Sequence, residues 1–154
     1  MGSATATGSA RVGASRAGVR PAEFRAALGE ALALADADDK VGPLIRAAGL
    51  RMRFEFPDAK MVLNLAAASS GKRHIQWSFS DDVGWEPKLE LTMSSAVANR
   101  YLQGNESLAI AIARGQVHFH GESRVAVLYL PATRLLCEPY RKVIVADYPE
   151  LVAV

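Results

Sequence analysis

Residues 91–131 read LTMSSAVANRYLQGNESLAIAIARGQVHFHGESRVAVLYLP, and their pattern decides the fold. The stretch begins inside an alternating segment, residues 89–93, in which apolar and polar side chains take turns as in a half-buried strand. Ser94 is well placed to cap a helix through residues 95–103, and Gly104 is well placed to end it. The pattern therefore predicts a strand that leads directly into a short helix.

The second half of the stretch predicts a helix, a strand and a long helix. Residues 106–114, which Asn105 can cap, are apolar on all sides, so we expect this helix to be buried or to face an apolar cavity. Residues 116–120 alternate as a strand. Gly121 then precedes a long apolar helix that Pro131 should kink or interrupt. The expected buried face of that helix carries Val125, Leu128, Tyr129, Ala132, Leu135 and Leu136.

Two helices are predicted before the first strand. Pro21 suits a first helical turn, and apolar residues then recur at three- and four-residue spacing up to an acidic run at residues 36–39. We interpret that run as a solvated loop in preference to a metal site. Residues 41–48 suggest a second, short helix that Gly49 ends.

From Leu50 the apolar period changes from about 3.6 residues towards 2, which is typical of half-buried strands. Residues 51–56, 61–65 and 75–80 alternate in this way, and turn-forming residues separate them. They predict an antiparallel meander to which residues 89–93 add a fourth strand. On the third strand we expect one shared face for Ile75, Trp77 and Phe79.

Composition excludes several classes of protein. The 154 residues suffice for one domain, and half of them are apolar, so a proper core can form. Lys and Arg number 18 against 16 Asp and Glu, which gives no electrostatic reason to expect a nucleic-acid partner. No stretch has the roughly 18 apolar residues of a membrane span. The single cysteine, Cys137, fits a reducing compartment, and we expect a cytoplasmic protein.

The stretch from Leu91 to Pro131 resembles the second half of the sterol carrier protein 2 (SCP-2) family in its order of elements and in the glycines at their junctions. The resemblance implies an α+β fold in which a five-stranded, mostly antiparallel sheet has helices packed on one face. It also implies a hydrophobic tunnel between sheet and helices that holds a fatty acyl chain, a sterol or a similar lipid.

Three segments follow from this resemblance and from composition. Residues 20–138 form the sterol-carrier-like domain, and residues 139–154 are a C-terminal extension that we expect to pack on it. Residues 1–19 are rich in Gly, Ser, Thr and Ala and contain no acidic residue, so we interpret them as a disordered tail. The same composition also suits an organellar transit peptide.

The candidate ligand-binding residues are the apolar side chains expected between the sheet and the helices. Any one of them could be ordinary core, because a core and an apolar tunnel wall are made of the same residue types. As a group they form the candidate site. They are Trp77, Phe79, Met93, Leu102, Ile110, Ile112, Phe119, Leu128 and Leu135.

Catalytic chemistry has weaker support in the sequence. His118 and His120 project to the same face of a strand, and a metal site would need a third ligand such as His74 or Glu122. We favour the alternative that both histidines lie on the polar face of the strand, and we expect no metal and no cofactor. We expect Cys137 to be an inert thiol, because the carboxylate next to it in sequence disfavours the thiolate.

Three hypotheses remain open. The first, which we favour, is a carrier of an apolar ligand. The second is a small enzyme of lipid or specialised metabolism that uses the same pocket with histidine acid, base or metal chemistry. The third is an interaction module whose apolar face pairs with a second copy or with a partner enzyme.

Overall fold

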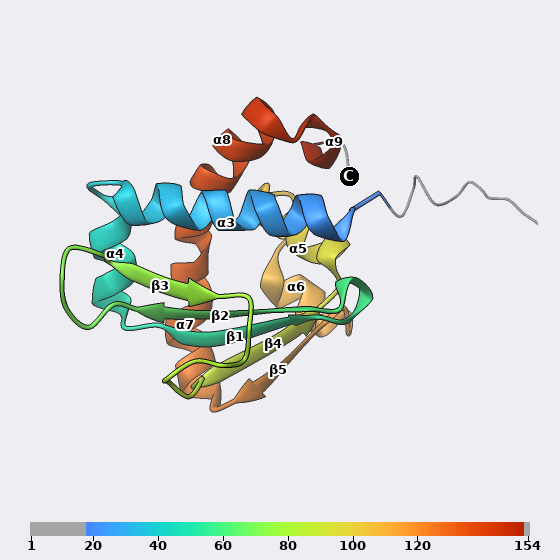
Figure 1. The fold of residues 1–154 in the computed structure, drawn as a ribbon. Helices are drawn as coiled ribbons and strands as arrows, with labels where there is room; N and C mark the ends of the chain where they lie inside the picture. The colour runs from blue at the N-terminus through green and yellow to red at the C-terminus, as the bar shows by residue number, and fades with distance from the viewer. Residues whose placement is uncertain (1–17, 153–154) are drawn as a thin grey trace, which may run out of the picture.

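The computed structural model describes residues 18–152, in which one sheet carries helices on one of its faces (Figure 1). The strands are β1 (Arg51–Phe56), β2 (Met61–Ala67), β3 (Ile75–Ser78), β4 (Leu89–Met93) and β5 (Val117–Gly121). The tail expected at residues 1–19 lies outside the described residues except for its last two.

The sheet has the strand order β3-β2-β1-β4-β5. The pairs β1–β2, β2–β3 and β4–β5 are antiparallel, and β1–β4 is parallel. The expected meander of three strands is confirmed, and so is the α+β fold with a five-stranded, mostly antiparallel sheet. Because β4 lies beside β1 and not beside β3, the chain crosses back over two strands between residues 79 and 88.

The crossing segment is tied to the face of the sheet that carries no helices. The Arg53 guanidinium donates to both carboxylate oxygens of Asp81, from Nε at 2.8 Å and from Nη2 at 2.9 Å. The buried Asn64 amide donates to Asp81 and to the Ser80 carbonyl, both at 2.9 Å. The hydrogen bonds from Arg53 and Asn64 lower the pKa of Asp81 to about 2, so this anchor stays charged over the ordinary pH range.

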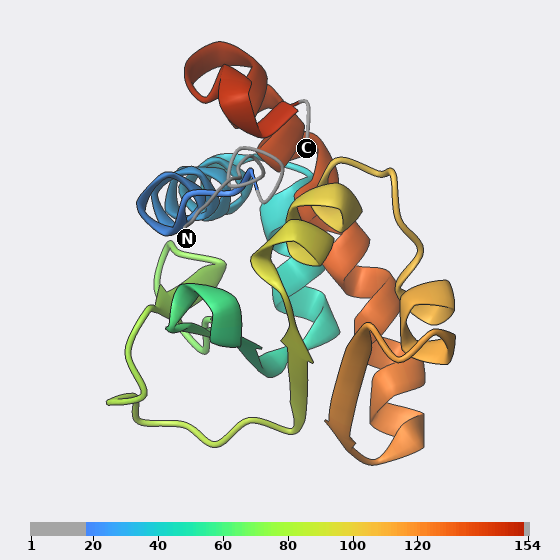
Figure 2. The ribbon, with the colours of Figure 1, turned by 90° about the vertical axis from the view of Figure 1, so that its right-hand side faces the viewer.

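The helices fall into two groups. The first comprises α3 (Pro21–Ala37) and α4 (Val41–Ala48); α8 (Cys137–Asp147) packs against α3, and α9 (Pro149–Val152) against α8. The second comprises α5 (Ser95–Leu102), α6 (Leu108–Ala113) and α7 (Ser123–Thr133), and one 3-10 turn (Arg134–Leu136) joins α7 to α8. Figure 2 shows α5, α6 and α7 on the side of the sheet formed by β4 and β5.

Alternation on the strands supplies the core. Met52, Phe54 and Phe56 of β1 are buried, and the rings of Phe24 on α3 and Phe56 meet edge to face with centroids 5.2 Å apart. Such pairs add roughly 0.5–1.5 kcal/mol to the burial of the rings. Tyr140 of α8 is fully buried and donates from its hydroxyl to Asn99 Oδ1 at 2.6 Å, which joins α8 to α5.

Helix ends agree with the sequence at α5 and differ at α6. The Ser94 hydroxyl accepts the N–H of Val97 at 3.1 Å, as expected of a cap. Asn105 does not cap α6, because that helix begins further along the chain, at Leu108. The Asn105 N–H closes the end of α5 on the Arg100 carbonyl at 2.9 Å, after Gly104 in the left-handed conformation. Ser107 caps α6 instead, so that helix begins at Leu108.

Two expectations about burial are wrong. The helix expected at residues 106–114 is not buried all round, because only Leu108 and Ala111 of α6 are buried. On α7 the buried side chains are Ala126, Tyr129 and Thr133, which follow each other at helical spacing. Leu128 lies on the opposite side of that helix and is 70% exposed.

Asp36 holds the first group of helices to the sheet. Its Oδ1 accepts the backbone N–H groups of His74 at 2.7 Å and Ile75 at 2.9 Å, and Oδ2 lies 3.6 Å from Arg73 Nε. The end of α3 is thereby fixed to the start of β3. The acidic run is therefore not wholly solvated as expected, because Asp36 accepts hydrogen bonds from two strand amides.

We predict that Asp36→Ala destabilises the protein by about 1–3 kcal/mol, because two part-buried N–H groups lose their acceptor. Asp36→Asn is the matched control, since it keeps one oxygen acceptor and should lose less. Urea unfolding measures both. An unchanged midpoint for Asp36→Ala would mean that this connection does not stabilise the fold.

Candidate ligand site

A small apolar cavity lies where the two groups of helices meet over the sheet. Its volume is about 30 Å³, which is room for roughly one or two water molecules. In this closed form it cannot hold an acyl chain. It is lined by Leu28, Phe54, Phe56, Leu63, Met93, Ala98, Tyr101, Leu102, Leu108, Thr133 and Leu136.

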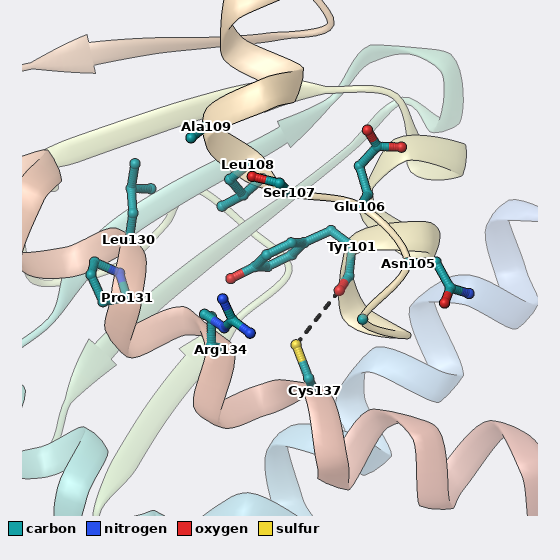
Figure 3. Close-up of a pocket in the computed structure, with 11 residues that line it drawn as sticks. Tyr101, Asn105, Glu106, Ser107, Leu108, Ala109, Leu130, Pro131, Arg134 and Cys137 are labelled. Atoms are coloured by element: carbon teal, nitrogen blue, oxygen red, sulfur yellow. Dashed lines mark hydrogen bonds between the residues drawn. The ribbon is translucent and has the colours of Figure 1, made fainter.

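An open groove of about 560 Å³ lies outside this cavity (Figure 3). The loop between α5 and α6 supplies polar groups on one side, and the end of α7 supplies apolar groups on the other. Residues from α6 and the start of α8 complete it. The groove is lined by Tyr101, Gly104, Asn105, Glu106, Ser107, Leu108, Ala109, Leu130, Pro131, Arg134 and Cys137.

Tyr101 and Leu108 line both the groove and the cavity, so these two side chains form the wall between them. The oxygen atoms of the Tyr101 and Thr133 hydroxyls are 2.6 Å apart. Thr133 donates its own proton to the Leu130 carbonyl at 2.6 Å, so the Tyr101 hydroxyl is the donor to Thr133. Burial raises the pKa of Tyr101 to about 12, which keeps this donor protonated.

Cys137 lies in the groove beside this wall. Its thiol contacts the Tyr101 carbonyl, with Sγ 3.5 Å from the oxygen (Figure 3). Burial raises the pKa of Cys137, although Arg141 and Arg134 act in the opposite direction. The thiol is therefore neutral at ordinary pH, as expected, but the cause is desolvation and not the neighbouring carboxylate of Glu138.

The predicted site residues lie in several different places. Met93 and Leu102 line the cavity. Trp77, Ile112 and Leu135 are half-buried and pack against the core, but they do not line the cavity. Phe79 lies beyond the end of β3, where its ring packs on α3 at Gly29 and under Arg25.

The other three predicted residues are exposed, which corrects the expectation that they line a tunnel wall. Ile110 is 50% exposed, Phe119 38% and Leu128 70%. Phe119 pairs with buried Leu91 and so lies on the side of the sheet that faces the helices, but β5 is an edge strand that the helices cover incompletely. Ile110 and Leu128 lie on the outward sides of short helices.

Sequence reasoning missed most of the cavity lining. Phe54 and Phe56 were visible as alternating apolar residues of β1, and Leu108 as the first apolar residue of α6. Tyr101 was visible on the buried side of α5. No pattern indicated that these residues surround one space, because they come from separate elements.

The histidines are remote from this site. His118 and His120 pair with Thr92 and Glu90 on the face of the sheet that carries no helices. His74 packs against Gly42 of α4. None of the three lines the groove or the cavity. Within residues 18–152, no three His, Cys, Asp or Glu side chains are grouped as metal ligands.

Comparison with solved structures identifies the architecture. The chain superposes on a ubiquinone synthesis protein, UbiJ-SCP2, with a TM-score of 0.54 and 14% identity over 75% of this chain and 96% of that one. It has the SCP-2-like fold. TT1886, a conserved hypothetical protein of Thermus thermophilus and a candidate sterol carrier, gives a TM-score of 0.52 and 15% identity, over 79% and 86% of the two chains.

The SCP-2-like fold was expected from residues 91–131, and the structure confirms it. No protein-family model matches the sequence, and no curated protein matches it. No helix among the described residues is long and apolar enough to cross a membrane.

We predict that Tyr101 makes stability fall as the pH rises from about 10 to about 12. An unfolded tyrosine ionises near pH 10, whereas burial holds the proton on Tyr101 up to about 12. The folded state therefore binds more protons in this interval, and stability is lost as the pH rises through it. Urea midpoints across the interval should fall more steeply for the natural protein than for Tyr101→Phe. If the urea midpoints of the two proteins fell equally with pH, the conclusion that the Tyr101 phenol is buried and protonated would be wrong.

Proposed function

We propose that this protein binds a single apolar small molecule, a fatty acyl chain, a sterol or a similar lipid, and carries it in the cytoplasm without changing it chemically. One observation carries the proposal. An open groove and an apolar cavity share a wall of two side chains, Tyr101 and Leu108, in a fold similar to that of TT1886, a candidate sterol carrier.

Ligand entry would require that wall to move. Separating Tyr101 from Thr133 costs about 1 kcal/mol for the lost hydrogen bond. Each methylene buried in return contributes about 0.8 kcal/mol, so an acyl chain of several carbons offsets the opening. A movement of Leu108 with α6 would join the groove and the cavity into one tunnel.

The groove offers polar partners for the other end of such a ligand. Arg134, Asn105 and Ser107 lie at its rim, while the cavity lining is apolar except for the hydroxyls of Tyr101 and Thr133. A ligand with an apolar chain and a carboxylate or hydroxyl head would therefore place its chain inside and its head outside. This division is typical of small-molecule sites, in which a few polar groups orient a largely apolar ligand.

The enzyme hypothesis gains no support from the site. The histidines that it requires do not line the groove or the cavity, and burial keeps the Cys137 thiol protonated. The hypothesis of a paired module without ligand remains an outcome of the experiment below.

We predict that long-chain fatty acid, fatty acyl-CoA or sterol binds with micromolar or tighter affinity, and that Leu102→Trp weakens the binding about ten-fold, because the larger ring fills the cavity. Leu108→Ala should not weaken it, since the wall becomes smaller. Trp77 does not line the cavity, so its fluorescence is a poor reporter of binding. A fluorescent fatty acid that unlabelled ligands displace is therefore the suitable probe.

Leu44→Trp, at an exposed position on α4, is the matched control and should bind like the natural protein. Circular dichroism checks that each variant folds, and native mass spectrometry reports bound lipid and oligomeric state together. The proposal fails if no ligand of the panel binds, or if folded Leu102→Trp binds every ligand as well as Leu44→Trp does. A dimer without bound lipid would favour the paired module.

A further inference from the structure

The outer sides of α6 and α7 both carry exposed apolar side chains. On α7, Val127 is 71% exposed and Leu128 is 70% exposed, and Pro131 follows them on the same side. On α6 the exposed residues include Ala109 and Ile110. We call these five residues the α6–α7 surface.

The two halves of this surface meet at the groove. Ala109 and Pro131 lie on opposite sides of its opening (Figure 3). α6 lines this groove through Leu108 and Ala109, and α7 lines it through Leu130 and Pro131. The groove therefore opens within the α6–α7 surface.

Packing inside the molecule does not account for these side chains. The inner side of α7 carries a tyrosine and a threonine, while its outer side carries valine and leucine. Single exposed aliphatic residues are ordinary, and Leu44 on α4 and Val145 on α8 are examples here. Adjoining aliphatic residues around the mouth of a pocket are less ordinary and indicate an interaction surface.

The charges around the surface are positive. Arg114 follows α6 and Arg134 follows α7, whereas Arg124 in the first turn of α7 is paired with Glu122. Neither helix contains an acidic residue. The carboxylates next to them are occupied, since Glu106 pairs with Arg100 at 3.1 Å and Glu122 with Arg124 at 2.8 Å.

We propose that the α6–α7 surface docks on an anionic lipid bilayer. The aliphatic side chains can contact the acyl chains of a bilayer, while the arginines beside them can pair with its anionic headgroups. A symmetric pair of copies would instead bring Arg114 and Arg134 together from both sides. The net charge of the whole chain is nearly balanced and gave no indication of this surface, because the net charge does not show where on the protein the arginines lie.

Docking in this orientation places the groove against the bilayer, so that a lipid can pass between membrane and cavity without crossing water. This consequence rests on the proposed function. Docking itself does not, because it requires only the exposed side chains and the arginines.

Vesicle flotation tests the proposal with the full chain. We expect the protein to float with vesicles of phosphatidylcholine containing phosphatidylglycerol, to float much less with phosphatidylcholine alone, and to be released by salt. The double variant Val127→Asp, Leu128→Asp should lose about ten-fold in vesicle affinity. Leu44→Asp with Val145→Asp is the matched control and should keep it.

Fatty-acid binding measured without vesicles separates this proposal from the proposed function. The Val127→Asp, Leu128→Asp variant should bind the fluorescent fatty acid as the natural protein does, since neither residue lines the cavity. Docking is refuted if the natural protein does not float with anionic vesicles, or if this variant floats equally well. A dimer that the same variant dissociates, with no flotation, would instead assign the surface to a second copy.

Discussion

The parallel pairing of β1 with β4 is the constraint on which the rest of the structure depends. After the meander the chain crosses back over two strands, and Asp81 on Arg53 anchors the crossing segment to the sheet. The apolar side of the sheet is then covered by two separate groups of helices, one before β1 and one after β4. The cavity lies where these groups meet, since Leu28 comes from α3 and Leu102 and Leu108 come from α5 and α6.

A junction between two helix groups is easier to open than the interior of either one. Apolar contacts hold the junction together, along with a few specific bonds such as that from the Tyr129 hydroxyl of α7 to the Gly49 carbonyl after α4. In the proposed function, the cavity of about 30 Å³ is the closed form of a site whose groove is already open. Arginines around aliphatic residues on the α6–α7 surface fit a protein that takes up its ligand at a lipid surface.

Much of the fold could be predicted from the sequence, because alternation and helical spacing are local signals. Ser94 and Gly104 marked the ends of α5, and the apolar residues of β1 marked its inner face. The site was harder to predict. Leu128 and Ile110 were expected inside because their helices are apolar, but the direction a helix faces depends on where its neighbours lie. Asn105 was not the cap because α6 begins only at Leu108, where the Ser107 hydroxyl caps it. Tyr101 gave no local signal that it separates a groove from a cavity.

In the proposed function, an apolar ligand enters the cavity behind Tyr101 and Leu108. Nuclear magnetic resonance of leucine methyl groups during titration with oleate can detect this entry. The methyl signals of Leu102, Leu108 and Leu136 should shift together and saturate, while those of Leu44 stay in place. Shifts confined to surface leucines such as Leu128, with the cavity leucines unmoved, would contradict it.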